Sequence, residues 1–159
     1  MTTSAKPIIL LVEPDPTALR AVTWFLSKAG HEVIRASSAR SALDRIRGLL
    51  TPLSAALIEV ELPDLDGIQL AEQIQIVQRE LPTLFMTKLH DINLEGVLNA
   101  PHSTLLKPFS MSSMMSAMQS LQRPPSQPGR AVSHTNLRAQ SDARPAEESS
   151  AAPRFRGRI

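Results

Sequence analysis

The chain has 159 residues and a formal net charge of +2, and its 42% hydrophobic content is ordinary for a soluble globular protein. This length is enough for one domain with a buried core, and no apolar run approaches the length that a membrane span needs. The absence of cysteine excludes disulfides, thiolate zinc sites and thiol nucleophiles. Since the first residues also lack the features of a signal peptide, we expect a cytoplasmic protein.

Five short apolar runs rich in β-branched residues predict five buried β-strands. They lie, in chain order, at Ile8–Val12, Glu32–Ala36, Ala55–Val60, Thr83–Thr87 and Thr104–Leu106. Between the first four runs, apolar residues recur at helical spacing. This spacing predicts helices over Thr17–Ala29, Ser38–Leu50 and Asp66–Arg79.

The apolar stripes of the second and third predicted helices run close to the ends of these helices. Leu49 belongs to the apolar stripe of the second helix, and Val77 belongs to that of the third. A fourth helix, over Asp91–Ala100, is expected to be brief or frayed, because it is short and Pro101 ends it. The last helix carries methionines at helical spacing, which favours core packing, with an adaptable partner-binding surface as the alternative. These methionines are Met111, Met114, Met115 and Met118.

The alternation of strands and helices with short loops predicts a doubly wound α/β domain. Its parallel sheet would be covered by helices on both faces, because the strands read as nearly continuous apolar runs. Right-handed crossovers then place the carboxyl ends of the first, third, fourth and fifth strands along one edge. Ligands of such folds bind at this edge, so the residues that follow these strands are the candidates for function.

The composition changes after Leu121. Residues 122–159 contain 5 Pro, 5 Ser and 7 Arg and carry a net charge of +4, whereas the residues before them carry −2. Because the later segment has few large apolar side chains, we predict a domain over 7–121 and a disordered tail over 122–159. The arginines are too dispersed to define a nucleic-acid site, so we expect at most weak binding of nucleic acid through this basic tail.

Acidic, hydroxyl and basic side chains follow the predicted strands. Glu13 and Asp15 come directly after the first strand, and Glu59 lies at the end of the third. Thr87 ends the fourth strand, and Lys107 follows the fifth. Because the carboxyl ends of these strands share one edge, we expect the carboxylates, the hydroxyl and the ammonium group to converge there.

The spacing of these residues resembles that of receiver domains of two-component response regulators. Glu59 precedes Thr87 by 28 residues, and Thr87 precedes Lys107 by 20. The motifs Leu-Pro-x-x-Asp-Gly at 62–67 and Lys-Pro-Phe at 107–109 add to the resemblance, which covers most of the predicted domain.

The resemblance implies a flavodoxin-like receiver fold with a phosphoryl-transfer site at this edge. In the family, an aspartate at the end of the third strand accepts a phosphoryl group, and an acidic pair after the first strand holds Mg²⁺. A hydroxyl and a lysine, at the positions of Thr87 and Lys107, contact the phosphoryl oxygens. The resemblance also implies a cis peptide bond between Lys107 and Pro108.

The sequence departs from the family pattern at the positions that carry this chemistry. The phosphoacceptor position holds Glu59 in place of aspartate, and the second position of the acidic pair is Pro14, which has no side-chain oxygen for Mg²⁺. Glu61 still offers a backbone carbonyl, and Asp15 fits a helix cap better than a replacement ligand. Thr104 stands where many receivers have an aromatic residue that moves on activation. We therefore expect weak or absent Mg²⁺ binding and no other cofactor.

The carboxylate of Glu59 has three possible roles. It could pair with Lys107 in a structural contact, imitate the phosphorylated state, or accept a phosphoryl group itself. The structural contact is the interpretation that we favour, because a buried lysine needs a partner whatever the function.

The sequence therefore predicts a pseudo-receiver, a non-enzymatic module of bacterial phosphorelay signalling that acts through protein–protein contacts without phosphorylation. Its expected partners are signalling proteins, such as a histidine kinase or an output protein. One alternative is a stand-alone response regulator that is phosphorylated with an altered metal site. Another is a flavodoxin-like protein that binds a small molecule at the acidic edge, although no glycine-rich phosphate loop supports it.

Overall fold

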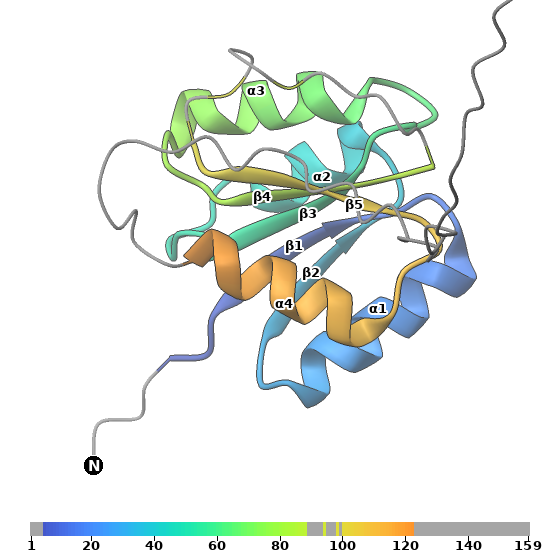
Figure 1. The fold of residues 1–159 in the computed structure, drawn as a ribbon. Coiled ribbons are helices and arrows are strands. Elements are labelled where there is room, and N and C mark those ends of the chain that lie inside the picture. The colour runs from blue at the N-terminus through green and yellow to red at the C-terminus, as the bar shows by residue number, and fades with distance from the viewer. Residues whose placement is uncertain (1–4, 89–93, 95–97, 99, 123–159) are drawn as a thin grey trace, which may run out of the picture. The chain divides into compact units, whose positions relative to one another are not determined.

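The computed structural model describes residues 5–88, 94, 98 and 100–122. Within these residues, the strands are β1 (Ile8–Val12), β2 (Glu32–Ala36), β3 (Ala55–Glu59), β4 (Thr83–Thr87) and β5 (His102–Leu106). The helices in the same part of the chain are α1 (Pro16–Lys28), α2 (Ala39–Ile46), α3 (Gly67–Val77) and α4 (Met111–Gln122). The strands form one parallel sheet in the order β2-β1-β3-β4-β5, which confirms the predicted doubly wound, flavodoxin-like fold (Figure 1).

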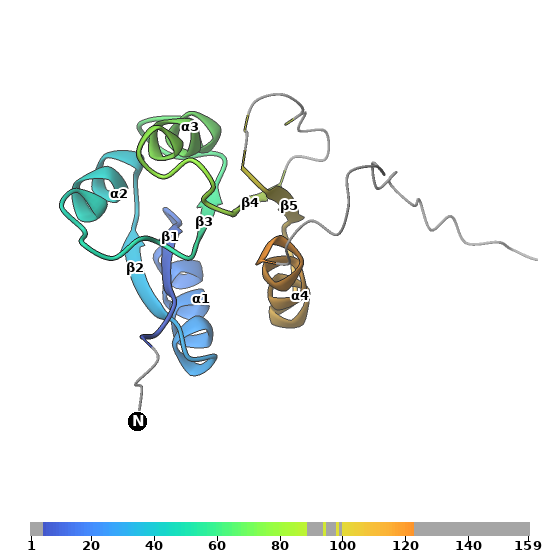
Figure 2. The same ribbon diagram turned by 90° about the vertical axis from the view of Figure 1, so that its left-hand side faces the viewer.

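Helices cover both faces of the sheet. In two perpendicular views, α2 and α3 lie on one face and α1 and α4 on the other (Figures 1 and 2). The helices begin where the sequence provides caps: Asp15 accepts a hydrogen bond at the start of α1, Ser38 at the start of α2 and Asp66 at the start of α3. The capping side chains thus start these helices directly after the strand-end loops.

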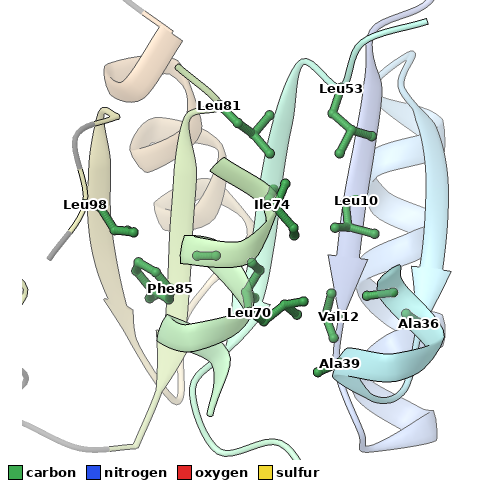
Figure 3. Close-up of a cluster of buried hydrophobic side chains, with 14 of the residues drawn as sticks. Leu10, Val12, Ala36, Ala39, Leu53, Leu70, Ile74, Leu81, Phe85 and Leu98 are labelled. Carbon is green, nitrogen blue, oxygen red and sulfur yellow. The ribbon is translucent and has the colours of Figure 1, made fainter. Parts of the chain in front are cut away.

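The core consists of two apolar layers, one on each side of the sheet. Leu10 and Phe85 of the sheet pack with Leu70 and Ile74 of α3 on one side (Figure 3). On the other side, the fully buried Met114 of α4 packs against the sheet, and its neighbours Met111, Met115 and Met118 belong to the same cluster. The prediction that the methionines of the last helix serve the core is therefore confirmed.

Two side chains that the periodicity assigned to the core lie outside it. Helix α2 ends at Ile46 because Gly48 adopts a left-handed backbone, with a φ of +85°, and Leu49 beyond it is exposed. Val77, the last residue of α3, is 90% exposed and does not join the core. Apolar spacing continues past the end of a helix without indicating where the helix stops.

Several predictions fall outside the described part of the chain. Most of the helix predicted over Asp91–Ala100 lies there, although Leu94 and Leu98 are described and are buried against the α2–α3 side of the core. The predicted tail lies there as well, except for Gln122, which ends α4. Among the described residues, none of the helices has the length and apolar character that crossing a membrane requires.

The register of the sheet brings four strand ends to one edge. Val12 pairs with Ile58, Glu59 with Met86, and Thr87 with Leu106, so β1, β3, β4 and β5 finish at nearly the same level. The loops that follow these strands therefore meet at the carboxyl edge of the sheet, where the candidate functional residues lie.

Candidate functional site

Two buried carboxylates define the centre of the carboxyl edge. Glu13 follows β1 and is only 2% exposed, and Glu59, the last residue of β3, is 5% exposed. The backbone N–H of Glu13 donates to the carbonyl of Ala36 at 3.0 Å, which extends the sheet pairing into the loop and holds this residue in place. Buried carboxylates need ionic or hydrogen-bonding partners, because burial removes their hydration.

Lys107 is the common partner of both carboxylates. Its Nζ lies 2.5 Å from Oε2 of Glu13 and forms a second ion pair with Oε2 of Glu59. The backbone N–H of Glu61 lies 3.4 Å from the other carboxylate oxygen of Glu59. Any two of these three residues are at least 46 positions apart in the sequence, and the structure brings them together as the sequence predicted.

The surroundings of Lys107 favour its charged form. Burial by itself would lower the pKa of the lysine, but hydrogen bonds and charges from Glu13 and Glu59 outweigh the burial and raise the pKa above its ordinary value. The ammonium group therefore stays charged at neutral pH and balances one of the two negative charges. Two carboxylates and one ammonium leave this cluster with a net charge of −1.

Thr87 lies beside this cluster at the end of β4 and is fully buried. Its backbone carbonyl accepts a hydrogen bond of 2.7 Å from the N–H of Lys107, so β4 positions the start of the lysine loop. The Lys107–Pro108 peptide bond is cis, as the resemblance implied. Thr104, at the position of the expected switch residue, is exposed on β5.

The remaining residues of the predicted acidic pocket serve the backbone or face solvent. Asp15 is exposed, and its Oδ1 accepts a 2.6 Å hydrogen bond from the N–H of Ala18, which is the helix-cap role that the sequence favoured. The N–H of Asp15 in turn donates to Oε1 of Glu13 at 3.0 Å. Pro14 is half-buried between them, and Glu61 is exposed.

These residues do not fit the Mg²⁺ ion that the family resemblance implies. Both buried carboxylates, Glu13 and Glu59, are engaged by Lys107, and Pro14 supplies no oxygen from its side chain. Mg²⁺ demands a near-octahedral shell of oxygens at about 2.1 Å. In the part of the chain that the structure describes, three acidic or histidine side chains nowhere gather closely enough to hold a metal ion.

A shallow hollow of about 640 Å³ opens above the cluster. Glu13, Glu59 and Lys107 form its polar floor, and the apolar side chains of Val22 and Phe109 form part of its wall. Asp15, Glu61 and Lys88 also line the hollow, so its lining holds more acidic than basic side chains. No separate nucleophile–base pair is among the residues that line it.

The structure gives two residues of the loop after β3 roles that the sequence analysis did not assign. Asp64, in the loop after β3, accepts hydrogen bonds from the N–H groups of Ala39 and Arg40 at 2.9 and 2.8 Å, at the start of α2. Gly67 lies so close to the backbone of Glu59 that an added Cβ would fall 2.2 Å from the carbonyl oxygen. The Leu-Pro-x-x-Asp-Gly motif contains this glycine, and the motif was the available signal for it.

Replacing Asp64 with asparagine is expected to lower the melting temperature at pH 7. The two backbone hydrogen bonds from Arg40 and Ala39 lower the pKa of Asp64, so this carboxyl stabilises the fold above its unfolded pKa of about 3.9. The stabilisation disappears as the pH falls through the lowered folded pKa, and asparagine offers one acceptor oxygen in place of two. Thermal denaturation of both proteins between pH 7 and pH 3 measures the difference.

The matched control is the substitution of Asp44 by asparagine. Asp44 forms an ion pair with the exposed Arg47 at 3.4 Å, and such surface pairs contribute little to stability. The interpretation fails if the melting temperature falls by the same amount in both variants. It also fails if the decrease in the melting temperature of Asp64→Asn persists unchanged at pH 3.

Comparisons with known proteins identify the family of this chain. A family model described as a response regulator receiver domain matches residues 9–119. The chain is 31% identical over 117 residues to the two-component response regulator ORR26 of Oryza sativa subsp. japonica, covering 72% of this chain and 20% of that protein. It is 29% identical over 115 residues to the response regulator receiver protein CpdR of Brucella abortus, covering 71% of this chain and 94% of CpdR.

The same fold occurs in solved structures. The chemotaxis protein CheY4 of Vibrio cholerae superposes with a TM-score of 0.66 at 20% identity, covering 74% of this chain and 99% of CheY4. The chain therefore spans about a fifth of the rice protein but nearly the whole of the Brucella and Vibrio proteins.

Proposed function

This chain belongs to the response regulator receiver family, and we propose that it serves two-component signalling as a pseudo-receiver. In this role it acts by binding other signalling proteins, a histidine kinase or an output protein, and its activity does not depend on phosphorylation. It catalyses no reaction of its own and works in the cytoplasm. The observation that carries the proposal is the ion-paired cluster of Lys107 with Glu13 and Glu59.

The cluster supports the proposal because it uses the groups that phosphoryl transfer would need. In receivers the lysine contacts the phosphoryl oxygens, whereas here the carboxylate of Glu59 is in ionic contact with Lys107. Glutamate is longer than aspartate by one methylene, which lets its carboxylate reach the lysine. A phosphoryl group would have to displace this carboxylate and enter a site of net negative charge.

The acidic pair supports the proposal from the other side of the cluster. Pro14 takes the place of a Mg²⁺ ligand, and the neighbouring carboxylate of Asp15 caps α1 through its Oδ1. Without Mg²⁺, the negative charge that develops in phosphoryl transfer is opposed only by Lys107, which already pairs with two carboxylates. In this proposal, Glu59 displaces the acceptor carboxylate by one methylene and Pro14 removes one ligand of the metal.

The test compares the wild type with the double variant Glu59→Asp, Pro14→Asp in backbone amide NMR spectra, with and without Mg²⁺ plus beryllofluoride, an analogue of the phosphoryl group. We expect no change in the wild type and specific shifts around Thr87 and Lys107 in the double variant. The single variant Pro14→Asp is the control, because it restores a carboxylate near the metal position while Glu59 still pairs with Lys107. Shifts of the wild type at this edge would refute the proposal.

A further inference from the structure

The face of the sheet that α1 and α4 cover differs in charge from the face that α2 and α3 cover. Side chains of α1 and α4 pack into the same apolar layer, so the outer sides of both helices belong to one face (Figures 1 and 2). Helix α1 carries Arg20 and Lys28 and no acidic residue, since Asp15 precedes the helix as its cap, and α4 carries no charged residue. Both signs of charge occur on α2 and α3, at Arg40, Asp44, Arg45 and Glu72.

Strand β2 adds a third cation to the α1–α4 face. This strand lies at the edge of the sheet, and Val33 packs into the layer that α1 covers. Because side chains alternate between the two faces along a strand, the exposed Arg35 lies on the α1 side and Glu32 on the other. In the part of the chain that the structure describes, no carboxylate forms an ion pair with Arg20, Lys28 or Arg35.

A large aromatic side chain lies between the two cations of α1. Trp24 is 63% exposed, and Nζ of Lys28 lies 5.8 Å from the centre of its ring. Arg20, Trp24 and Lys28 follow one another at steps of four residues, which places all three on the same side of the helix. From Arg20 to Lys28 the helix rises by about 12 Å. Helix α1 thus presents an exposed indole ring with a cation on either side.

We propose that the α1 surface, formed by Arg20, Trp24, Lys28 and Arg35, binds single-stranded nucleic acid. Charge is the first reason, because cations without carboxylate partners attract the phosphates of a nucleic acid strand. The indole ring is the second reason. A base of any identity stacks on an exposed aromatic ring while cations beside the ring contact the neighbouring phosphates.

The composition of the rest of the chain favours a long polyanion over a compact acidic protein. Residues 122–159, which follow α4 in the sequence, contain seven arginines against three acidic residues. Their arginines are too dispersed to define a site by themselves, but dispersed cations still add to the attraction of a strand long enough to reach them. A compact acidic protein engages only the cations that it contacts directly.

This inference does not rest on the proposed function. The α1 surface consists of the outer side of α1 and the edge strand β2, whereas the Lys107 cluster lies at the carboxyl edge of the sheet. The double variant Glu59→Asp, Pro14→Asp should therefore bind nucleic acid as the wild type does. The failure of either proposal leaves the other intact.

Titration of the full chain with a fluorescently labelled oligothymidylate at low salt tests the proposal. Because Trp24 is the only tryptophan of the chain, its fluorescence reports stacking at this surface, and we expect oligothymidylate to quench it. The anisotropy of the label measures the affinity of each variant. Trp24→Leu should weaken binding at least about fivefold, the lower range for the loss of one stacked base, without changing the salt dependence.

Charge variants test the contribution of the cations. Arg20→Glu, Lys28→Glu should weaken binding and reduce the slope of log affinity against log salt by about 1.4, since each phosphate contact of a single strand contributes about 0.7. The matched control is Arg40→Glu, Arg79→Glu, which changes the net charge equally at exposed arginines of the α2–α3 side and should keep the slope. Each replaced side chain is exposed, so all variants should keep the circular dichroism of the wild type.

Four outcomes overturn the proposal. The first is a wild type that does not bind oligothymidylate at low salt. The second is equal weakening in the two charge variants, which would attribute binding to net charge alone. The third is an affinity unaffected by Arg20→Glu, Lys28→Glu, which would assign binding to residues 122–159. The fourth is equal quenching of Trp24 by polyglutamate, which would favour an acidic protein as the partner.

Discussion

Replacing Lys107 with methionine is expected to lower the free energy of unfolding by about 3–5 kcal/mol at pH 7, the usual effect of removing one partner from a buried ion pair. Methionine keeps most of the volume and the apolar stem of lysine, so the change removes chiefly the charge. Glu13 and Glu59 would then lie close together without a cation, in surroundings that leave them almost no contact with water. Denaturant unfolding of the wild type and the variant measures the loss.

Lys88→Met is the control for this substitution. Lys88 is exposed and lines the same hollow, so it shares the general location of Lys107 without the two ion pairs. Its replacement should change stability by no more than a few tenths of a kcal/mol. Equal effects of the two substitutions would show that the cluster contributes nothing specific.

The effect of Lys107 also depends on pH. Because the folded protein raises the pKa of this lysine, its contribution to stability is fully present below the unfolded pKa of about 10.4. The contribution is lost as the pH rises through the folded pKa. The difference between the wild type and Lys107→Met should therefore be constant up to about pH 10 and narrow above it.

A second substitution separates lost attraction from the repulsion left behind. Adding Glu59→Gln to Lys107→Met removes one of the two buried carboxylates, so the double variant should recover part of the stability. The two changes are in direct contact and should be strongly non-additive. Simple addition of the two single effects would contradict the ion-pair interpretation.

Replacing Gly67 with alanine is expected to destabilise the protein by about 3 kcal/mol, the upper range for overpacking a core. In a helix interior, alanine is better than glycine by about 1 kcal/mol, although Gly67 is only the first residue of α3, so propensity by itself would favour alanine weakly. The structure reverses this expectation, since the new Cβ would lie 2.2 Å from the carbonyl oxygen of Glu59 and 3.0 Å from Cγ2 of Ile58. The nearest obstacle is backbone, so β3 or α3 must move.

Gly48→Ala provides the comparison. Gly48 has a positive φ but no atom within 4 Å of an added Cβ, so the substitution introduces backbone strain of about 1–2 kcal/mol and no collision. Gly67→Ala should therefore be the more destabilising of the two, and it alone should shift the amide signals of Glu59 and Glu61. A Gly67→Ala protein as stable as the wild type would show that the contact relaxes at no cost.

Local sequence patterns were sufficient for the architecture. The five predicted runs became the five strands. The inner strands β1, β3 and β4 are buried along their whole length, as a sheet covered on both faces requires, whereas the edge strands β2 and β5 are partly exposed. The cap at Asp15 was predicted, and the caps at Ser38 and Asp66 are equally local, since a cap involves residues only two or three positions apart. The ends of α2 and α3 were not readable, and so Leu49 and Val77 were assigned to the core although both are exposed.

The candidate site could be predicted in part. The positions of Glu13, Glu59, Thr87 and Lys107 followed from the rule that parallel strands end along one edge, and the departures at Pro14 and Glu59 were visible as residue types. The sequence left three roles open for Glu59. Only the three-dimensional structure showed that Glu59 pairs with Lys107 and that Lys107 also pairs with Glu13.

The sequence by itself determined which elements form, in what order, and which functional groups lie at their ends, because periodicity and capping act over a few neighbouring residues. Tertiary structure alone decided that one lysine joins two carboxylates, that Asp64 caps a helix 25 residues away, and that Gly67 must remain without a side chain. It also decided that α1 and the uncharged α4 share one face of the sheet. Each of these contacts joins distant segments, and its geometry depends on the register of the sheet and the packing of helices against it.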